Sequence, residues 1–164
     1  MATPDLTTDD IPGDGRDETL LERADRNWDD ILQELRVTLT GTQVMTGFLL
    51  ALAFQQRFEQ LNAAQIDLYL VLVGLAALST ALGVAPVILH RTFFRREGKD
   101  HVVILGNRLL LTELIVVGLL AIGVTAFIFD FVLGGPSGVI AAVVSTVVVL
   151  ALWVVLPQAR KASA

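Results

Sequence analysis

Glu113 is the residue of this sequence with the clearest potential for chemistry. It lies inside residues 109–117, a run whose other members are apolar apart from Thr112. A carboxyl group within a membrane is costly, and it usually faces a partner or a water-filled cavity. Glu113 could therefore exchange protons or cations, or it could pair with Arg108 or Arg36 and hold two helices together. If the membrane begins at Leu109, Glu113 is only about 6 Å deep and the pairing is favoured, whereas a membrane that begins nearer Val102 places it about 16 Å deep and favours exchange.

A seam of small and hydroxyl side chains is the second polar feature. Thr38, Thr42 and Thr46 recur every four residues and so share one face of a helix, with Gln43 and Gly47 beside them. Small residues let membrane helices approach closely, and an amide can form a hydrogen bond across such a contact. The seam predicts a helix-packing surface, with an ion pathway as the alternative.

Basic residues gather between two of the long apolar runs. This candidate cluster consists of His90, Arg91, Arg95, Lys99, Asn107 and Arg108. Cationic side chains at the end of a span set its topology and contact lipid headgroups. We expect that role, with an anionic-ligand or partner site as the alternative. We expect no nucleic acid, because the cluster lies at the membrane and the chain has a net charge of −5.

Long apolar helices have to position all of these residues. Hydrophobic residues make up 54% of the 164-residue chain, and they form long blocks rather than short periods. A helix needs about 20 apolar residues to cross the hydrocarbon core of a bilayer. We therefore predict an all-α fold, a four-helix transmembrane bundle that occupies residues 37–157. The predicted spans are 37–58, 66–90, 103–130 and 138–157.

The segments on either side of this membrane domain differ in character. Residues 1–16 are rich in Asp, Thr, Gly and Pro, which predicts a disordered acidic tail. Residues 17–36 repeat apolar side chains every three or four positions, which predicts an N-terminal cytoplasmic amphipathic helix. Its polar face is acidic, which is unusual on a lipid surface, so we expect it to dock on the basic loop 90–108. Residues 158–164 form a short basic tail.

The distribution of Lys and Arg predicts the orientation. Residues 90–108 contain five Lys or Arg, whereas residues 55–67 contain one and residues 130–138 contain none. Positive charge accumulates on the cytoplasmic side of membrane proteins. The N- and C-termini are therefore both expected to be cytoplasmic. An even number of spans agrees with this, because it places both termini on the same side of the membrane.

The composition also limits the chemistry. There is no cysteine and there are two histidines, so disulfides and Cys-based metal sites are excluded, and no His-built metal site is expected. No set of a nucleophile and its base is visible. We therefore expect no enzyme activity, no cofactor and no metal.

Several motifs together resemble those of a known family. They are Gln43, Phe54-Gln55-Gln56-Arg57-Phe58, Leu61, Gln65, Tyr69, Ala85-Pro86, His90-Arg91, Phe94-Arg95, Lys99 and Asn107-Arg108. The set is similar to that of small bacterial four-span membrane proteins described only as a domain of unknown function, and it covers residues 34–130. The resemblance implies a multi-pass protein of the bacterial cytoplasmic (inner) membrane and no catalytic residues. Some relatives carry an automatic sodium:proton antiporter label.

Two functions remain open at this point. The first is association within the lipid bilayer, as a homo-oligomer or as an accessory subunit of a membrane-protein complex. The second is a small proton- or cation-coupled transporter that uses Glu113.

Overall fold

The computed structural model describes residues 20–93 and 99–162, which are almost entirely helical. Four elements are long and apolar enough to cross a membrane, and no strand occurs in this part of the chain. These elements are α1 (Leu20–Leu52), α2 (Ala63–Phe93), α3 (Lys99–Leu133) and a rod made of α4 (Ser137–Leu150), the π-helical turn η2 (Ala151–Val155) and α5 (Leu156–Ala162). The predicted all-α fold with four membrane-spanning helices is confirmed.

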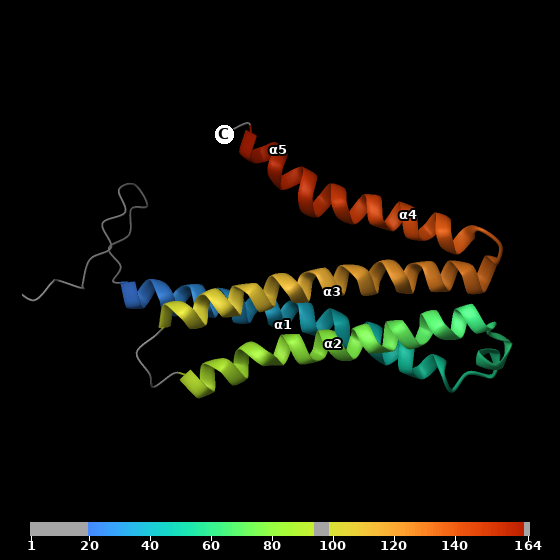
Figure 1. Ribbon diagram of the computed structural model, residues 1–164, viewed down its shortest axis with the longest axis horizontal. Coiled ribbons are helices and arrows are strands. Elements are labelled where there is room, and N and C mark those ends of the chain that lie inside the picture. Colours follow the sequence, from blue (N-terminus) through green and yellow to red (C-terminus); the bar gives the residue numbers. More distant parts are fainter. Residues whose placement is uncertain (1–19, 94–98, 163–164) are drawn as a thin grey trace, which may run out of the picture.

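The first three helices form one body, and the fourth element leans away from it. α1, α2 and α3 pack against one another, whereas α4 packs mainly on α3 (Figure 1). Leu20, Phe93, Lys99 and Ala162 lie toward one end of the molecule, which we call the terminal end. The opposite hairpin end carries the α1–α2 and α3–α4 connections. All four spanning elements therefore run between the same two ends.

α1 is longer at its start and shorter at its end than the predicted first span, residues 37–58. It runs without a break from Leu20 to Leu52, so the amphipathic segment and the first span form one helix. A 3-10 helix, η1 (Gln56–Gln60), then turns the chain back toward α2. The turn occurs early because Phe58 folds onto Tyr69 of α2, edge to face, with ring centres 5.1 Å apart. The predicted tail 1–16, residues 17–19 and residues 163–164 lie outside the described residues.

The amphipathic part of α1 docks through its apolar face. Trp28, Ile31 and Leu35 are buried, and Ile31 and Leu35 share a core with Leu110 of α3. The Trp28 ring lies directly on Gly106, where an added Cβ would come within 2.6 Å of a ring carbon. The carboxyl groups of this segment remain exposed, at Asp25, Asp29, Asp30 and Glu34. Its contact with the first turns of α3 therefore depends on apolar packing.

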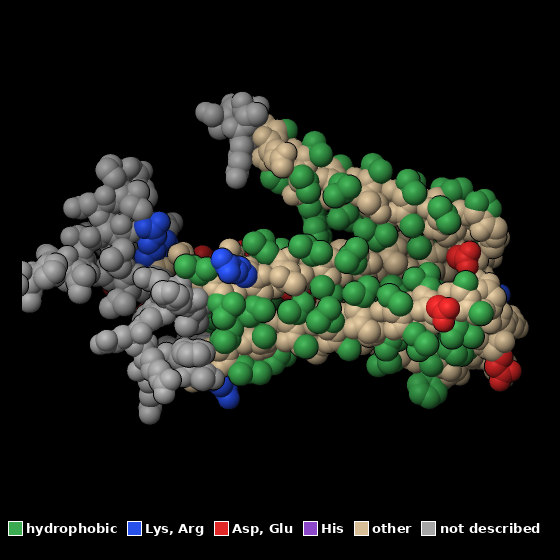
Figure 2. Space-filling view, viewed as in Figure 1, with side chains coloured by type: hydrophobic (Ala, Val, Ile, Leu, Met, Phe, Trp, Pro, Cys, Tyr) green, Lys and Arg blue, Asp and Glu red, His purple; other side chains and the backbone are tan. Residues whose placement is uncertain are grey.

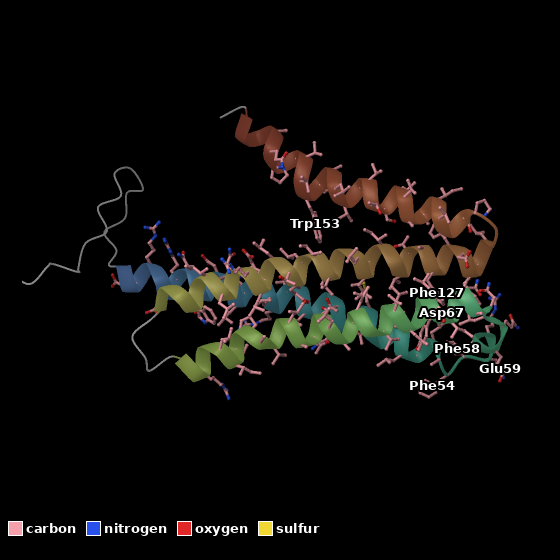
Figure 3. All side chains as sticks on the ribbon, viewed as in Figure 1. Phe54, Phe58, Glu59, Asp67, Phe127 and Trp153 are labelled. Carbon is pink, nitrogen blue, oxygen red and sulfur yellow. The ribbon has the colours of Figure 1, made fainter. Side chains whose placement is uncertain are left out.

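A second core closes the hairpin end. It combines Leu49, Leu61, Tyr69, Leu72 and Phe127 from α1, the connection, α2 and α3. The Tyr69 hydroxyl donates a hydrogen bond to the Leu49 carbonyl at 3.0 Å, which satisfies the polar tip of an otherwise apolar side chain. Figure 3 shows Phe58 and Phe127 in this region, whereas Phe54 points away from it.

The rod formed by α4, η2 and α5 is attached along one side of α3. Gly134 and Gly135 form the turn with φ values of 68° and 61°, a left-handed conformation that glycine adopts without strain. Farther along, Trp153 reaches across to α3 and packs on Gly118 (Figure 3). The π-helical turn around Trp153 precedes Pro157, which has no N–H to donate and would crowd the carbonyl four residues before it in an α-helix.

Replacing Gly106 with alanine should destabilise the three-helix body. The new methyl group would overlap the rigid Trp28 ring, and overpacking of this kind costs about 1–3 kcal/mol. Unfolding in detergent, followed by tryptophan fluorescence, measures the change. Gly74→Ala in α2 is the matched control, since nothing lies within 4 Å of the added Cβ, and it should leave stability unchanged or raise it. Equal losses in both variants would contradict the Trp28–Gly106 contact.

Candidate functional site

Glu113 lies at the interface of α2 and α3, fully removed from the surface. Its exposed fraction is 0%, and that of Ser79 on α2 is also 0%. The Ser79 hydroxyl donates a hydrogen bond of 2.5 Å to Oε1 of Glu113. Arg36 and Arg108 are both exposed, and in the described part of the chain Ser79 is the partner of this carboxyl group. The predicted tie between two helices is thus made by a hydroxyl group rather than by an arginine.

The second carboxyl oxygen of Glu113 has no hydrogen-bond partner. Oε2 is buried, and no described residue donates to it or accepts from it. A buried polar atom in this state loses its hydration without replacement, at a cost of about 1–3 kcal/mol. Among the described residues, this oxygen therefore remains without a compensating hydrogen bond.

Thr42 of α1 completes a polar layer within the three-helix body. It is 1% exposed, and Thr42, Ser79 and Glu113 are the three buried polar side chains of the described residues. Leu39 of α1 packs on Gly83 of α2. Thr42 is one turn from Leu39, and Ser79 is one turn from Gly83, both toward the hairpin end. Each helix of the body therefore contributes one polar side chain at the same depth.

The position of Ser79 along α2 places this layer deep in the span. Ser79 is twelve residues from Asp67 and twelve from Arg91, which are both exposed. Twelve helical residues extend about 18 Å, so the layer lies midway between the charged ends of α2. By this measure the layer is deep in α2, whereas on α3 the exposed Arg108 lies only five residues from Glu113, about 8 Å along the helix.

The predicted threonine and glutamine seam does not form one surface. Thr42 is buried and Thr46 is half-buried, whereas Gln43, about 100° around the helix from Thr42, is exposed. Thr42 and Thr46 donate to the backbone carbonyls four residues earlier, at 3.0 and 2.8 Å. Their hydroxyl hydrogens are therefore used within α1, and Gln43 is left as the polar group that faces outward.

The described members of the basic cluster lie on α2 and α3, toward the terminal end. Arg91, Asn107 and Arg108 are exposed, at the end of α2 and near the start of α3. His90 and Lys99 belong to the same helices, but their side chains lie outside the description, and Arg95 lies outside the described residues. In the described part of the chain, no three or more His, Asp or Glu side chains gather as a metal ion would require.

The family-like motif around residues 54–69 builds the hairpin end. Asn62 and Gln65 cap α2 reciprocally, each side-chain oxygen accepting from the backbone N–H of the other residue at 3.0 Å. The Gln65 amide also donates to Asp130 of α3 at 2.8 Å. With Phe58 and Tyr69 these residues fix the connection between α1 and α2, so the motif has a structural role.

Sequence reasoning missed Ser79, the direct partner of Glu113. A serine in the middle of an apolar run is a weak signal, because hydroxyl groups in membrane helices also bond to their own backbone, as Thr80 does to the Ala76 carbonyl at 3.0 Å. The pairing becomes visible only when α2 and α3 are placed side by side.

Comparison with known proteins gives one match. A family model described as a family of unknown function (DUF6328) matches residues 17–157. This confirms the resemblance to an uncharacterised family and extends it over α1 and α4. No curated protein matches the chain, and no solved structure matches it.

Removing the Ser79 hydroxyl should destabilise the protein. In Ser79→Ala both oxygens of the buried Glu113 carboxyl would lack a partner among the described residues, at a cost of roughly 1–3 kcal/mol. Thermal unfolding in detergent, followed by circular dichroism, measures the loss. Thr80→Ala is the matched control on the next position of α2, where the change should stay within about 0.5 kcal/mol. If Ser79→Ala unfolds at the same temperature as the wild type, the hydrogen bond between Ser79 and Glu113 does not contribute to stability.

Proposed function

The chain belongs to this family of unknown function (DUF6328), and we propose that it is a multi-pass membrane protein that associates with a second copy of itself and catalyses no reaction. The association uses the α1 face, which we define as Thr40, Gln43 and Gly47 on the side of α1 turned away from α2 and α3. The observation that carries the proposal is the outward-facing amide of Gln43 within an apolar span.

Gln43 lies well inside the apolar part of α1. It is nine residues from Leu52, where the helix ends, and seven from Arg36. These separations correspond to about 14 and 10 Å along the helix. Hydrocarbon offers no hydrogen-bond partner, so an amide exposed to it pays a desolvation cost of several kcal/mol. A partner helix with a polar group at the same depth removes that cost.

The rest of the α1 face leaves room for such a helix. Gly47 lies one turn from Gln43 on the same side, and no described residue lies within 4 Å of a Cβ added there. Gly41 and Gly74 are also open, whereas Leu39 packs on Gly83 and Leu72 on Gly123. Small residues on a membrane helix allow another backbone to approach closely. The open side of Gly47 therefore fits a helix from outside this chain.

A second copy is the occupant that matches this amide best. Two copies inserted in the same direction and related by a two-fold axis along the membrane normal place identical residues opposite each other at equal depth. An amide both donates and accepts hydrogen bonds, so Gln43 is complementary to Gln43 of another copy. An accessory role in a larger complex would use the same face against a helix of another protein.

The orientation of the proposed assembly follows from its charges. Arg91 and Arg108 are exposed on the terminal-end halves of α2 and α3, and Arg36 is exposed at the middle of α1. On the face shown in Figure 2, Lys and Arg gather at the terminal end, Asp and Glu gather at the hairpin end, and apolar side chains cover the surface between them. The positive-inside rule places the terminal end in the cytoplasm. We therefore propose that the chain crosses the bacterial cytoplasmic membrane with both termini inside.

Single cysteines on the α1 face should cross-link two copies in the native membrane. The chain has no cysteine, so Thr40→Cys, Gln43→Cys and Gly47→Cys each introduce one thiol. A disulfide requires Cα atoms within about 7 Å, which the proposed contact provides at these positions. Mild oxidation and non-reducing electrophoresis measure the dimer fraction. Val143→Cys on α4 is the matched control, since Val143 is also exposed, lies on another helix and should remain monomeric.

A second variant tests the role of the amide itself. Gln43→Leu should weaken dimerisation in detergent roughly fivefold, because interhelical hydrogen bonds in membranes contribute about 1 kcal/mol. Cross-linking that is equal at Val143 and on the α1 face would reject the interface. A stoichiometric second protein cross-linked at Gln43 in place of a second copy would establish the accessory-subunit role.

The buried carboxyl group supports a second candidate function. Oε2 of Glu113 is buried and unpartnered, in a layer that receives one polar side chain from each helix of the body. A group in this position can hold a proton or a small cation within the membrane, which favours a small proton- or cation-coupled transporter. This candidate differs from the first because it needs movement of an ion rather than association.

Proton flux through reconstituted vesicles separates the two candidates. With a pH gradient and a dye trapped inside, transport at this site predicts flux in the wild type and its loss in Glu113→Gln, which keeps the shape and removes the titratable group. Glu34→Gln is the control, because that carboxyl is exposed on α1 and should retain flux. Wild-type vesicles no leakier than empty vesicles would exclude the transport candidate and leave the association proposal intact.

A further inference from the structure

We propose that the groove between α1 and α3 at the hairpin end binds a phospholipid, with an acyl chain in the groove and the phosphate at Arg57. This inference goes beyond the proposed association, since it concerns another side of α1 and another kind of ligand.

The groove is an apolar depression of about 380 Å³. Its lining includes Met45, Phe48 and Leu52 from α1 and Phe127, Phe131 and Val132 from α3. No charged or polar side chain contributes to it. Phe48 and Val132 are strongly exposed beside it, so the groove opens toward the surroundings of the helices. An apolar depression on a membrane-spanning surface matches a hydrocarbon chain in polarity.

Arg57 stands where the headgroup of such a lipid would lie. Its guanidinium carbon is 5.1 Å from the centre of the Phe131 ring, and Phe131 lines the groove. Arg57 is the single Lys or Arg in the hairpin-end segments 53–67 and 130–138. In the part of the chain that the structure describes, no carboxylate forms an ion pair with it, so its charge is not neutralised there.

The surroundings of Arg57 hold it in place. Phe131 stacks on Phe127 with ring centres 6.3 Å apart and planes within 5°. Phe58, the next residue in η1, packs edge to face on Tyr69. A guanidinium over an aromatic face keeps its N–H edges free, and these edges form paired hydrogen bonds with phosphate oxygens. The groove and the cation are thus fixed to one another by the aromatic core.

The charge around Arg57 indicates the class of headgroup. Glu59, Asp67 and Asp130 lie at the same end, and Glu59 and Asp67 are exposed. These carboxyl groups disfavour a headgroup with a net negative charge and suit one that carries an ammonium group beside its phosphate. Phosphatidylethanolamine has this combination.

Native mass spectrometry of the purified full-length chain tests the proposal. Delipidated protein is titrated with phosphatidylethanolamine, and bound lipid is counted per chain. The wild type should retain one lipid in preference to others, and Arg57→Gln should bind it roughly tenfold more weakly, since a charge-assisted hydrogen bond contributes about 1.5–3 kcal/mol. Arg36→Gln is the control at the terminal end and should bind as the wild type does.

A second variant tests the groove without touching the cation. Val132→Phe should fill the groove and also lower binding about tenfold, whereas Val147→Phe on α4, at a comparable exposure of 60% against 63%, should not. If Val132→Phe unfolds, Ile128→Phe from the same lining replaces it. Equal binding by the wild type, Arg57→Gln and the groove variant would overturn the proposal. Cross-linking of Val132→Cys to a second copy would overturn it too, by showing that protein occupies the groove. Neither result depends on whether the α1 face dimerises.

Discussion

Close contact between helices at glycine is the constraint on which this structure depends. Hydrocarbon chains are as apolar as leucine, so burying apolar side chains does not by itself hold membrane helices together. Here Trp28 packs on Gly106, Leu39 on Gly83 and Leu72 on Gly123, so each pair of helices in the body meets where one side lacks a side chain. The helices then approach closely enough for dispersion contacts and a few hydrogen bonds to fix their arrangement.

That closeness is what allows a carboxyl group to be buried. Glu113 and Ser79 meet across α2 and α3 at 2.5 Å, and Thr42 reaches the same layer from α1. If the three helices were farther apart, lipid or water could reach this layer. The Glu113 carboxyl group could then form hydrogen bonds with water instead of with Ser79. The bond also explains why Ser79 and Glu113 are tolerated in surroundings that are otherwise apolar, while the Thr42 hydroxyl donates to the Thr38 carbonyl of its own helix. The layer is therefore a consequence of packing as well as the strongest chemical feature of the chain.

The outer surface of the three-helix body carries the residues and the groove that take no part in packing α1, α2 and α3 together. Gln43 and Gly47 face away from α2 and α3, and Arg57 sits over Phe131 beside an apolar groove. They lie on different sides of α1, so a protein partner on one side and a lipid on the other do not compete. The rod formed by α4, η2 and α5 packs on yet another side of α3. The protein thus presents separate surfaces to protein and to lipid around one closed core.

The sequence by itself determined the number and type of the spanning helices, because apolar runs of about 20 residues have one stable solution in lipid. It also marked Glu113 as an isolated carboxyl group and showed that Lys and Arg collect in one connection. Only the tertiary structure decided which polar groups meet. Periodicity places Thr42 and Gln43 on different sides of one helix, but the rotation of that helix against its neighbours decides which of them is buried. The packing of α2 on α3 made Ser79, rather than Arg36 or Arg108, the partner of Glu113, and the fold of the hairpin end set Arg57 on Phe131. These are contacts between residues far apart in the chain, and they depend on side-chain packing that no local pattern encodes.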